Sequence, residues 1–415
     1  MSLPSSPTST TSSRRSAQTT ALTGSKVGLS VTLFSRAASI TSTPLFYDCD
    51  TIQGALTLDI PKKRNVTRIT ISVYGTHRSA TETVFLNISK VLWSRGGKSI
   101  PSEKDASKRE LRVGANTWNF AIPLPLHCDA KAVGEPIPLP PTHSGPALPD
   151  TVIYEMQCDV QRGIFSEAEV LRIPFQYRPQ IVARPGSRYR MKAYANGTPI
   201  PGPDIDPAGW KGFSASYSGD FFSRRKAQID CEFFLATPLE YPRNYPIPFT
   251  VKIHCADEQV LSYLAAAQSF LSVSLRCRTF YNTAPAALTD DVVGTGQYEV
   301  VSRWPQTVEL AGEIRTSGGL QPSFRFKKLA REYVVQFQVG SAALQFDLDD
   351  ESESIIEAPV AICTLPAEGP LPISYSRRTN NASRGSSDDP SPVSPVASIP
   401  SFSLAGVYND YVMPV

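Results

Sequence analysis

Short runs of alternating apolar and polar residues, separated by prolines, constrain the fold of this chain more than any other feature. The stretch Pro322–Ser341, PSFRFKKLAREYVVQFQVGS, has a basic turn at Lys327–Ala330 between two such runs. A period of two places successive side chains on opposite faces of a strand, so the stretch predicts a hairpin with one buried face. Proline breaks helices and is common at strand ends and in loops. The chain has 36 prolines among its 415 residues. We therefore expect an all-β protein.

Alternating runs occur in two blocks along the chain. A length of 415 residues exceeds what one hydrophobic core usually serves. Between the blocks, PIPGPDIDPAG has the composition of a linker. More than ten short strands divided in this way predict two immunoglobulin-like antiparallel β-sandwiches in tandem. The segment QVLSYLAAAQSF has helical spacing and predicts one short helix.

The two ends of the chain are poor in apolar residues and rich in serine, threonine and proline. Such segments bury too little apolar surface to offset the entropy of ordering, so we expect disordered tails. The predicted organisation is a disordered tail at 1–24, an N-terminal β-sandwich at 25–180, a linker at 181–207, a C-terminal β-sandwich at 208–366 and a disordered tail at 367–415.

Cysteine usage and charge bear on the compartment and the partners. The seven cysteines are odd in number and form no CxxC pair, which favours buried thiols of a cytosolic protein. The N-terminus lacks the apolar core of a signal peptide, so the sequons at Asn65, Asn87, Asn196 and Asn381 are interpreted as chance matches. A net charge of +3 argues against nucleic acid as a partner. We expect a cytoplasmic protein that is peripherally membrane-associated at times.

Motifs for catalysis are missing from the sequence. HExxH, GxSxG, GxxxxGK[ST] and GxGxxG do not occur, and Gly294 with Gly296 in VGTGQY is interpreted as a turn. His127, Cys128 and Asp129 are adjacent, but neighbouring residues on an extended chain point in opposite directions and form no site by adjacency. We therefore expect no enzymatic activity, no cofactor and no bound metal.

Two basic clusters lie in predicted turns. The first is Lys62, Lys63 and Arg64, and the second is Lys327 and Lys328 with Arg331. Most such clusters are solvated hairpin ends. The functional alternative is recognition of phosphoryl oxygens, either on phosphorylated tails or on anionic lipid. In the C-terminal FSLAGVYNDYVMPV, Tyr408 and Tyr411 are candidates for a docking peptide.

The order of these segments resembles the arrestin family, in particular its fungal branch near the alpha-arrestins. The resemblance covers roughly residues 26–365, and its weight lies in the collinear order of degenerate motifs. The stretch PSFRFKKLAREYVVQFQV is the most family-specific of them. The other matching segments are VGLSVTLFS, IQGALTLDI, RITISVYG, WNFAIPLPLHC, LPPTHSG, VIYEMQCDV, IPFQYRP, LEYPRNYPIPFTVKI, LRCRTFY and VELAGEIRT.

The resemblance implies a non-catalytic cytosolic scaffold built from two curved β-sandwiches. Such proteins bind the cytosolic tails of membrane proteins and support their trafficking, endocytosis or regulation by ubiquitin ligases. The ligase-recruiting PPxY motif of alpha-arrestins is not matched, because Pro140-Pro141 is followed by Thr142 and His143. Two alternatives stay open: a coat or retromer-like subunit of a stable complex, and a secreted carbohydrate-binding β-sandwich.

Overall fold

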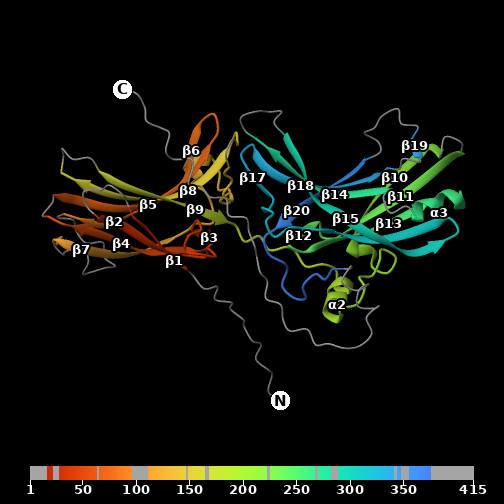
Figure 1. Cartoon of the computed structure of the whole chain (residues 1–415), viewed down its shortest axis with the longest axis horizontal. Coiled ribbons are helices and arrows are strands. Elements are labelled where there is room, and N and C mark those ends of the chain that lie inside the picture. The colour runs from red at the N-terminus through yellow and green to blue at the C-terminus, as the bar shows by residue number, and fades with distance from the viewer. Residues whose placement is uncertain are drawn as a thin grey trace, which may run out of the picture. The chain divides into compact units, whose positions relative to one another are not determined.

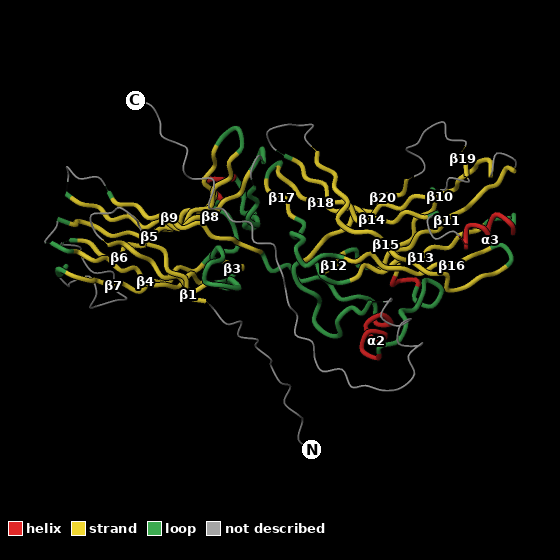
Figure 2. Tube along the Cα trace, in the orientation of Figure 1, coloured by secondary structure: helices red, strands yellow, loops and turns green. Residues whose placement is uncertain are grey.

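The structure, a computed structural model, describes residues 16–21, 28–62, 65–95, 111–145, 148–163, 168–221, 225–266, 270–281, 288–340, 344–346 and 355–374. Within these ranges the chain is predominantly β, as predicted, and Figure 2 shows how few helices accompany the strands. Among the described residues, no helix is long and apolar enough to span a bilayer. The helices are α1 (Ala130–Val133), α2 (Arg188–Asn196), α3 (Glu258–Ala266) and a 3-10 turn at Pro207–Gly209.

The chain divides into two compact units, each with its own hydrophobic core. Unit 1 comprises Met1–Gln180, Tyr281–Ala287 and Phe324–Leu329. Two segments that lie late in the chain, within the predicted block 208–366, therefore belong to unit 1. Alternation in the sequence indicates that a strand has a buried face, but it does not indicate which core buries that face. Unit 2 comprises Ile181–Phe280, Leu288–Ser323 and Ala330–Val415.

Unit 1 contains two sheets that share one core (Figure 1). The four-stranded sheet has the order β1-β2-β4-β7, and the five-stranded sheet has the order β3-β9-β8-β5-β6. Fully buried side chains such as Val31 and Leu56 from the first sheet pack with Ile71 and Val152 from the second, which gives a β-sandwich core. The strands are β1 (Ser16–Ala21), β2 (Gly28–Ser35), β3 (Leu45–Tyr47), β4 (Thr51–Ile60), β5 (Val66–Arg78), β6 (Glu82–Ser94), β7 (Gly114–Pro123), β8 (Thr151–Arg162) and β9 (Glu169–Arg178).

Strand β1 corrects the prediction that residues 1–24 are wholly disordered. It pairs antiparallel with β2, and polar contacts hold it in place. The buried Gln18 amide donates to the carbonyl of Ser39 at 3.1 Å and accepts from the Ser35 hydroxyl at 2.7 Å. The apolar alternation that reveals other strands is missing from SAQTTA, because here an amide occupies the buried position.

Unit 2 is built on one long path of strands, β12-β20-β18-β14-β15-β16-β13-β11-β10-β19. Strand β15 pairs with β14 along its first half and with β16 along its second half. Gly294 and Gly296 lie inside β15 at this change of partner, so the predicted turn in VGTGQY is wrong. A Cβ atom at Gly296 would lie 2.9 Å from Val273 Cβ, which explains the glycine by close packing. The strands are β10 (Trp210–Phe221), β11 (Arg225–Ala236), β12 (Glu240–Pro242), β13 (Pro246–His254), β14 (Leu271–Phe280), β15 (Leu288–Trp304), β16 (Thr307–Arg315), β18 (Leu329–Val339), β19 (Leu344–Phe346) and β20 (Ile355–Cys363). Strand β17 (Phe324–Phe326), which precedes the turn into β18, belongs to unit 1.

The helices of unit 2 differ in how well the sequence predicts them. Helix α3 confirms the predicted short helix, and its Val260, Leu261 and Leu264 are buried in the core of unit 2. Helix α2 lies in the stretch predicted as a linker, 181–207. Its ends carry ordinary signals, since the Ser187 hydroxyl accepts from Arg190 N–H and Gly197 adopts a left-handed C-cap.

All seven cysteines are free thiols, and six of them are buried. Cys49 is the exposed one and adopts φ 61°. The prediction of buried thiols is confirmed for the other six.

Candidate functional site

The basic turn between β17 and β18 is the sequence-predicted site that the structure defines best. Lys327 and Lys328 are both exposed, and Lys327 adopts φ 53°, a left-handed conformation that is uncommon for lysine. Directly before them, Phe326 is 0% exposed and packs in the core of unit 1. Lys327 Nζ lies 3.4 Å from the Thr83 hydroxyl of β6. The turn is therefore fixed to unit 1 by a buried ring and presents two ammonium groups to solvent.

Aromatic packing explains how this segment is held. The Phe326 ring centroid lies 5.1 Å from that of Phe85 and 5.4 Å from that of His77, in an edge-on arrangement with the imidazole. Two residues earlier, the Phe324 centroid lies 6.1 Å from that of His143. Aromatic pairs at these separations contribute roughly 0.5–1.5 kcal/mol beyond their burial. The alternating Phe-x-Phe pattern thus supplies the anchor for the turn.

A buried polar group lies beneath the turn. His77 is 1% exposed on β5, and its Nε2 has no hydrogen-bond partner among the described residues. Burial lowers the pKa of His77, the Asp150 carboxylate acts in the opposite direction, and the Lys327 charge lowers it further. Because burial dominates, the imidazole is neutral at pH 7. The positive charge at this place is therefore carried by the lysines of the turn.

The other predicted contact residues lie in different parts of the chain. Lys62 is exposed just after β4, whereas Lys63 and Arg64 lie outside the described residues. Arg331 belongs to unit 2, on β18, where its side chain is partly buried and its Nε has no acceptor within the described ranges. The structure thus places Lys327 and Lys328 together and assigns Arg331 to the other unit. Tyr408 and Tyr411 also lie outside the described residues.

Cys128 and Asp129, which follow His127 in the sequence, have separate structural roles. The Cys128 thiol is buried and lies 3.7 Å from the carbonyl of Pro138, and burial raises its pKa to about 12. A protonated thiol is a weak nucleophile. Asp129 caps α1 by accepting from Lys131 N–H at 3.0 Å. Over the described ranges, no three side chains of His, Cys, Asp or Glu converge in a way suited to a metal ion.

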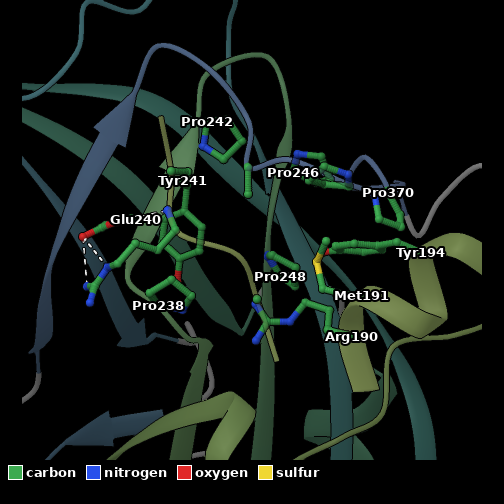
Figure 3. A pocket seen from close by; sticks show the side chains of 15 residues that line it. Arg190, Met191, Tyr194, Pro238, Glu240, Tyr241, Pro242, Pro246, Pro248 and Pro370 are labelled. Carbon is green, nitrogen blue, oxygen red and sulfur yellow. Dashed lines mark hydrogen bonds and ion pairs between the residues drawn. The ribbon is translucent and has the colours of Figure 1, made fainter. Parts of the chain in front are cut away.

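A pocket on unit 2 was not predicted from the sequence (Figure 3). Its cavity has a volume of ≈ 50 Å³, which is enough to hold water. Arg190 and Tyr194 come from α2, Tyr241 from β12, and prolines form much of the remaining wall. The prolines that line it are Pro238, Pro242, Pro246, Pro248, Pro370 and Pro372.

Arg190 is the notable polar group of this pocket. It is 4% exposed, and its Nη2 donates to the carbonyls of Gly209 at 2.6 Å and Thr237 at 2.7 Å. Its guanidinium also lies 5.8 Å from the ring centroid of Trp210. Burial lowers the pKa of Arg190, since a buried charge loses hydration. The Nε atom has no hydrogen-bond partner among the described residues, so one buried donor of the pocket wall is unsatisfied.

Comparison with models of known protein families and with curated proteins finds no match to this chain.

Proposed function

We propose that this protein is a non-catalytic cytosolic adaptor of the arrestin-like class, with two β-sandwiches in tandem, that binds phosphorylated cytosolic tails of membrane proteins. The observation that carries the proposal is the exposed Lys327–Lys328 pair, held on unit 1 by the buried Phe326. Two compact β-rich units and the collinear order of segments support the architecture. Seven free thiols support the cytosolic side of the membrane.

The chemistry of the turn suits phosphate. Ammonium groups donate charge-assisted hydrogen bonds to phosphoryl oxygens, which are about twice as strong as neutral ones. A phosphoserine or phosphothreonine brings close to two negative charges at pH 7 and three acceptor oxygens. Because Phe326 fixes the backbone of the turn, less entropy is lost when the lysines engage a ligand. The proposed role of Lys327 and Lys328 is contact, and the tail binds without being chemically changed.

Peptide binding by the full-length protein tests this proposal. We expect a synthetic peptide with several phosphoserines to bind more tightly than its unphosphorylated form, with an affinity that falls as salt is added. K327E/K328E should weaken binding by at least about tenfold, because the attraction becomes repulsion. The matched control is K192E/K211E, which changes the same charge at two exposed lysines of unit 2.

Three results would overturn the proposal. The first is equal phosphopeptide binding by K327E/K328E and the wild type. The second is equal weakening by the control pair, which would indicate an effect of net charge alone. The third is binding of vesicles with anionic lipid, lost in K327E/K328E, without any binding of phosphopeptide. That result would identify a lipid headgroup as the ligand of the turn.

A further inference from the structure

The segment that follows β20 lies across the pocket of unit 2. Backbone hydrogen bonds fix its start, since Leu365 O accepts from Ala183 N–H at 3.0 Å and Ile181 O accepts from Leu365 N–H at 3.0 Å. Beyond this point, Ala367, Pro370 and Pro372 line the pocket beside α2 (Figure 3). These residues fall in the stretch 367–415 that was predicted to be disordered, and the structure corrects that prediction for residues 367–374. We call residues 366–374 the strap.

Alternation along the strap shows which side contacts the pocket. Pro370 and Pro372 line it, whereas Leu371 is 51% exposed and Ile373 is 37% exposed. Ser374 returns to the protein, where its hydroxyl donates to Oε1 of Glu313, a carboxylate on β16 that is 2% exposed. The strap is therefore an extended Pro-x-Pro-x-Ser segment with its prolines and serine directed inward.

The contact between the strap and the pocket is of a kind that another peptide can replace. Proline has no backbone N–H, so Pro370 and Pro372 donate no main-chain hydrogen bond to the pocket wall. They line the pocket together with Tyr194, Tyr241 and other prolines. Aromatic and proline-lined grooves recognise extended proline segments in this way, because such segments are already stiff before they bind.

One hydrogen-bond donor beside the pocket has no acceptor among the described residues. Arg190 lines the remaining cavity of ≈ 50 Å³, and this donor is its Nε. The Nε atom is fully buried, and an ideal Cβ at Gly186 would lie 3.5 Å from it, so this atom does not face the cavity. Arg190 therefore shapes the pocket wall through the bonds of its Nη2 to the carbonyls of Gly209 and Thr237.

From these observations we propose that the pocket of unit 2 is a binding site for an extended Pro-x-Pro-x-Ser peptide of a partner protein, and that the strap is its internal competitor. The partner segment takes the place of Pro370 and Pro372, and its hydroxyl takes the place of Ser374 on Glu313. The site is distinct from the lysine turn and needs no phosphate, so its test does not depend on the proposed function.

Gly369, which does not itself line the pocket, offers a variant that loosens the strap. It adopts φ 113°, which side-chain-bearing residues rarely adopt, and an added Cβ would lie 3.3 Å from Met191 Cε. G369A should therefore lower the occupancy of the pocket by the strap. The matched control is G340A, because a Cβ at Gly340 meets nothing within 4 Å.

The probe is a fluorescein-labelled peptide, AEGPLPISY, with the sequence of residues 367–375, titrated with full-length protein and followed by fluorescence polarisation. We expect weak binding to the wild type and to G340A, and roughly tenfold tighter binding to G369A, because apparent affinity scales with the fraction of open sites. A probe with glycine at both proline positions should not bind. R190K, which lacks the planar fork that holds the carbonyls of Gly209 and Thr237, should disturb the pocket wall and weaken binding to G369A when introduced into that variant.

Thermal unfolding of each variant verifies that the fold is retained. Should R190K prevent folding, the proposal is decided by G369A and the glycine-substituted probe alone. Equal affinity of the probe for G369A and the wild type would overturn the competition between strap and partner. Equal binding of the glycine-substituted probe would overturn proline recognition, because it would show unspecific adhesion to an apolar surface.

Discussion

The rings of Phe233 and Phe337 stack in the core of unit 2, with 4.9 Å between their centroids and 18° between their planes. Phe233 lies on β11 and Phe337 on β18, two strands that are far apart in the order of the sheet. Side chains of strands that are not neighbours in a sheet can stack only if the sheet folds so that its two halves face each other. This pair therefore joins the two halves of the path on which unit 2 is built.

Removing one of these rings should destabilise unit 2. Both are 0% exposed, so F337A creates a cavity and should reduce the free energy of unfolding by about 3–5 kcal/mol. F337L keeps most of the volume and should cost less than about 1.5 kcal/mol. Urea denaturation followed by circular dichroism measures both. As a control, F280A changes a phenylalanine of the same unit that is 38% exposed, and a loss as large as that of F337A would contradict this account.

Much of the fold could be predicted because one face of most strands is buried. In β4 and β8, buried residues alternate with more accessible ones along the strand, and that pattern is visible in the sequence. The pattern is missing where polar groups take the buried positions, as Gln18 does in β1 and Arg190 does in α2. It also does not distinguish one core from another, which is why Phe326 was expected in the second block.

The candidate sites were predictable to different extents. Lys327 and Lys328 could be found because a basic pair interrupts an alternating run, and a turn exposes what it contains. The pocket could not be found in this way. Its wall joins α2, residues 238–248 and the strap, which are far apart in sequence, and its polar group is an arginine without a motif. Only the caps at Ser187 and Gly197 gave a local signal for α2.

Two central glycines should not tolerate a methyl group. An ideal Cβ at Gly54 lies 2.3 Å from Thr32 O, and one at Gly312 lies 2.4 Å from Gln297 O. Both neighbours are backbone atoms of paired strands, so they cannot move aside cheaply. G54A and G312A should each cost about 1–3 kcal/mol of stability in thermal or urea unfolding. G340A, where a Cβ meets nothing within 4 Å, should be close to the wild type. An equal loss in all three would indicate a general effect of alanine.

Thiol labelling should distinguish Cys49 from the other cysteines. Cys49 is exposed and the other six are buried, and burial raises the pKa of Cys158 to about 12 and that of Cys363 to about 11. Because the thiolate is the reactive form, we expect one thiol to react with a disulfide reagent at pH 8 in the native protein, and seven after unfolding without reductant. C49S should abolish the native reaction. Five or fewer thiols after unfolding would reveal a disulfide and favour the secreted alternative.

His77 should make stability depend on pH. Burial lowers its pKa in the folded protein, whereas in the unfolded chain the pKa is about 6.5. Below about pH 6.5 the unfolded state therefore binds a proton that the folded state does not, so stability is full above this pH and is lost as pH falls. The maximum slope from one such group is about 1.4 kcal/mol per pH unit. Asp150 and Lys327 are the charged groups that act on it, with opposite signs.

Urea unfolding of the full-length protein between pH 5 and 8 measures this dependence. H77Q should be less stable than the wild type at pH 7.5, because it disturbs the packing against Phe326, but its stability should fall less steeply below pH 6.5. H254Q, which changes an exposed histidine of unit 2, serves as the matched substitution for comparison. The slope separates the two roles of His77, since a residue that acts by packing alone shifts the curve without changing its steepness. Equal slopes for H77Q and the wild type would therefore show that His77 does not titrate on unfolding.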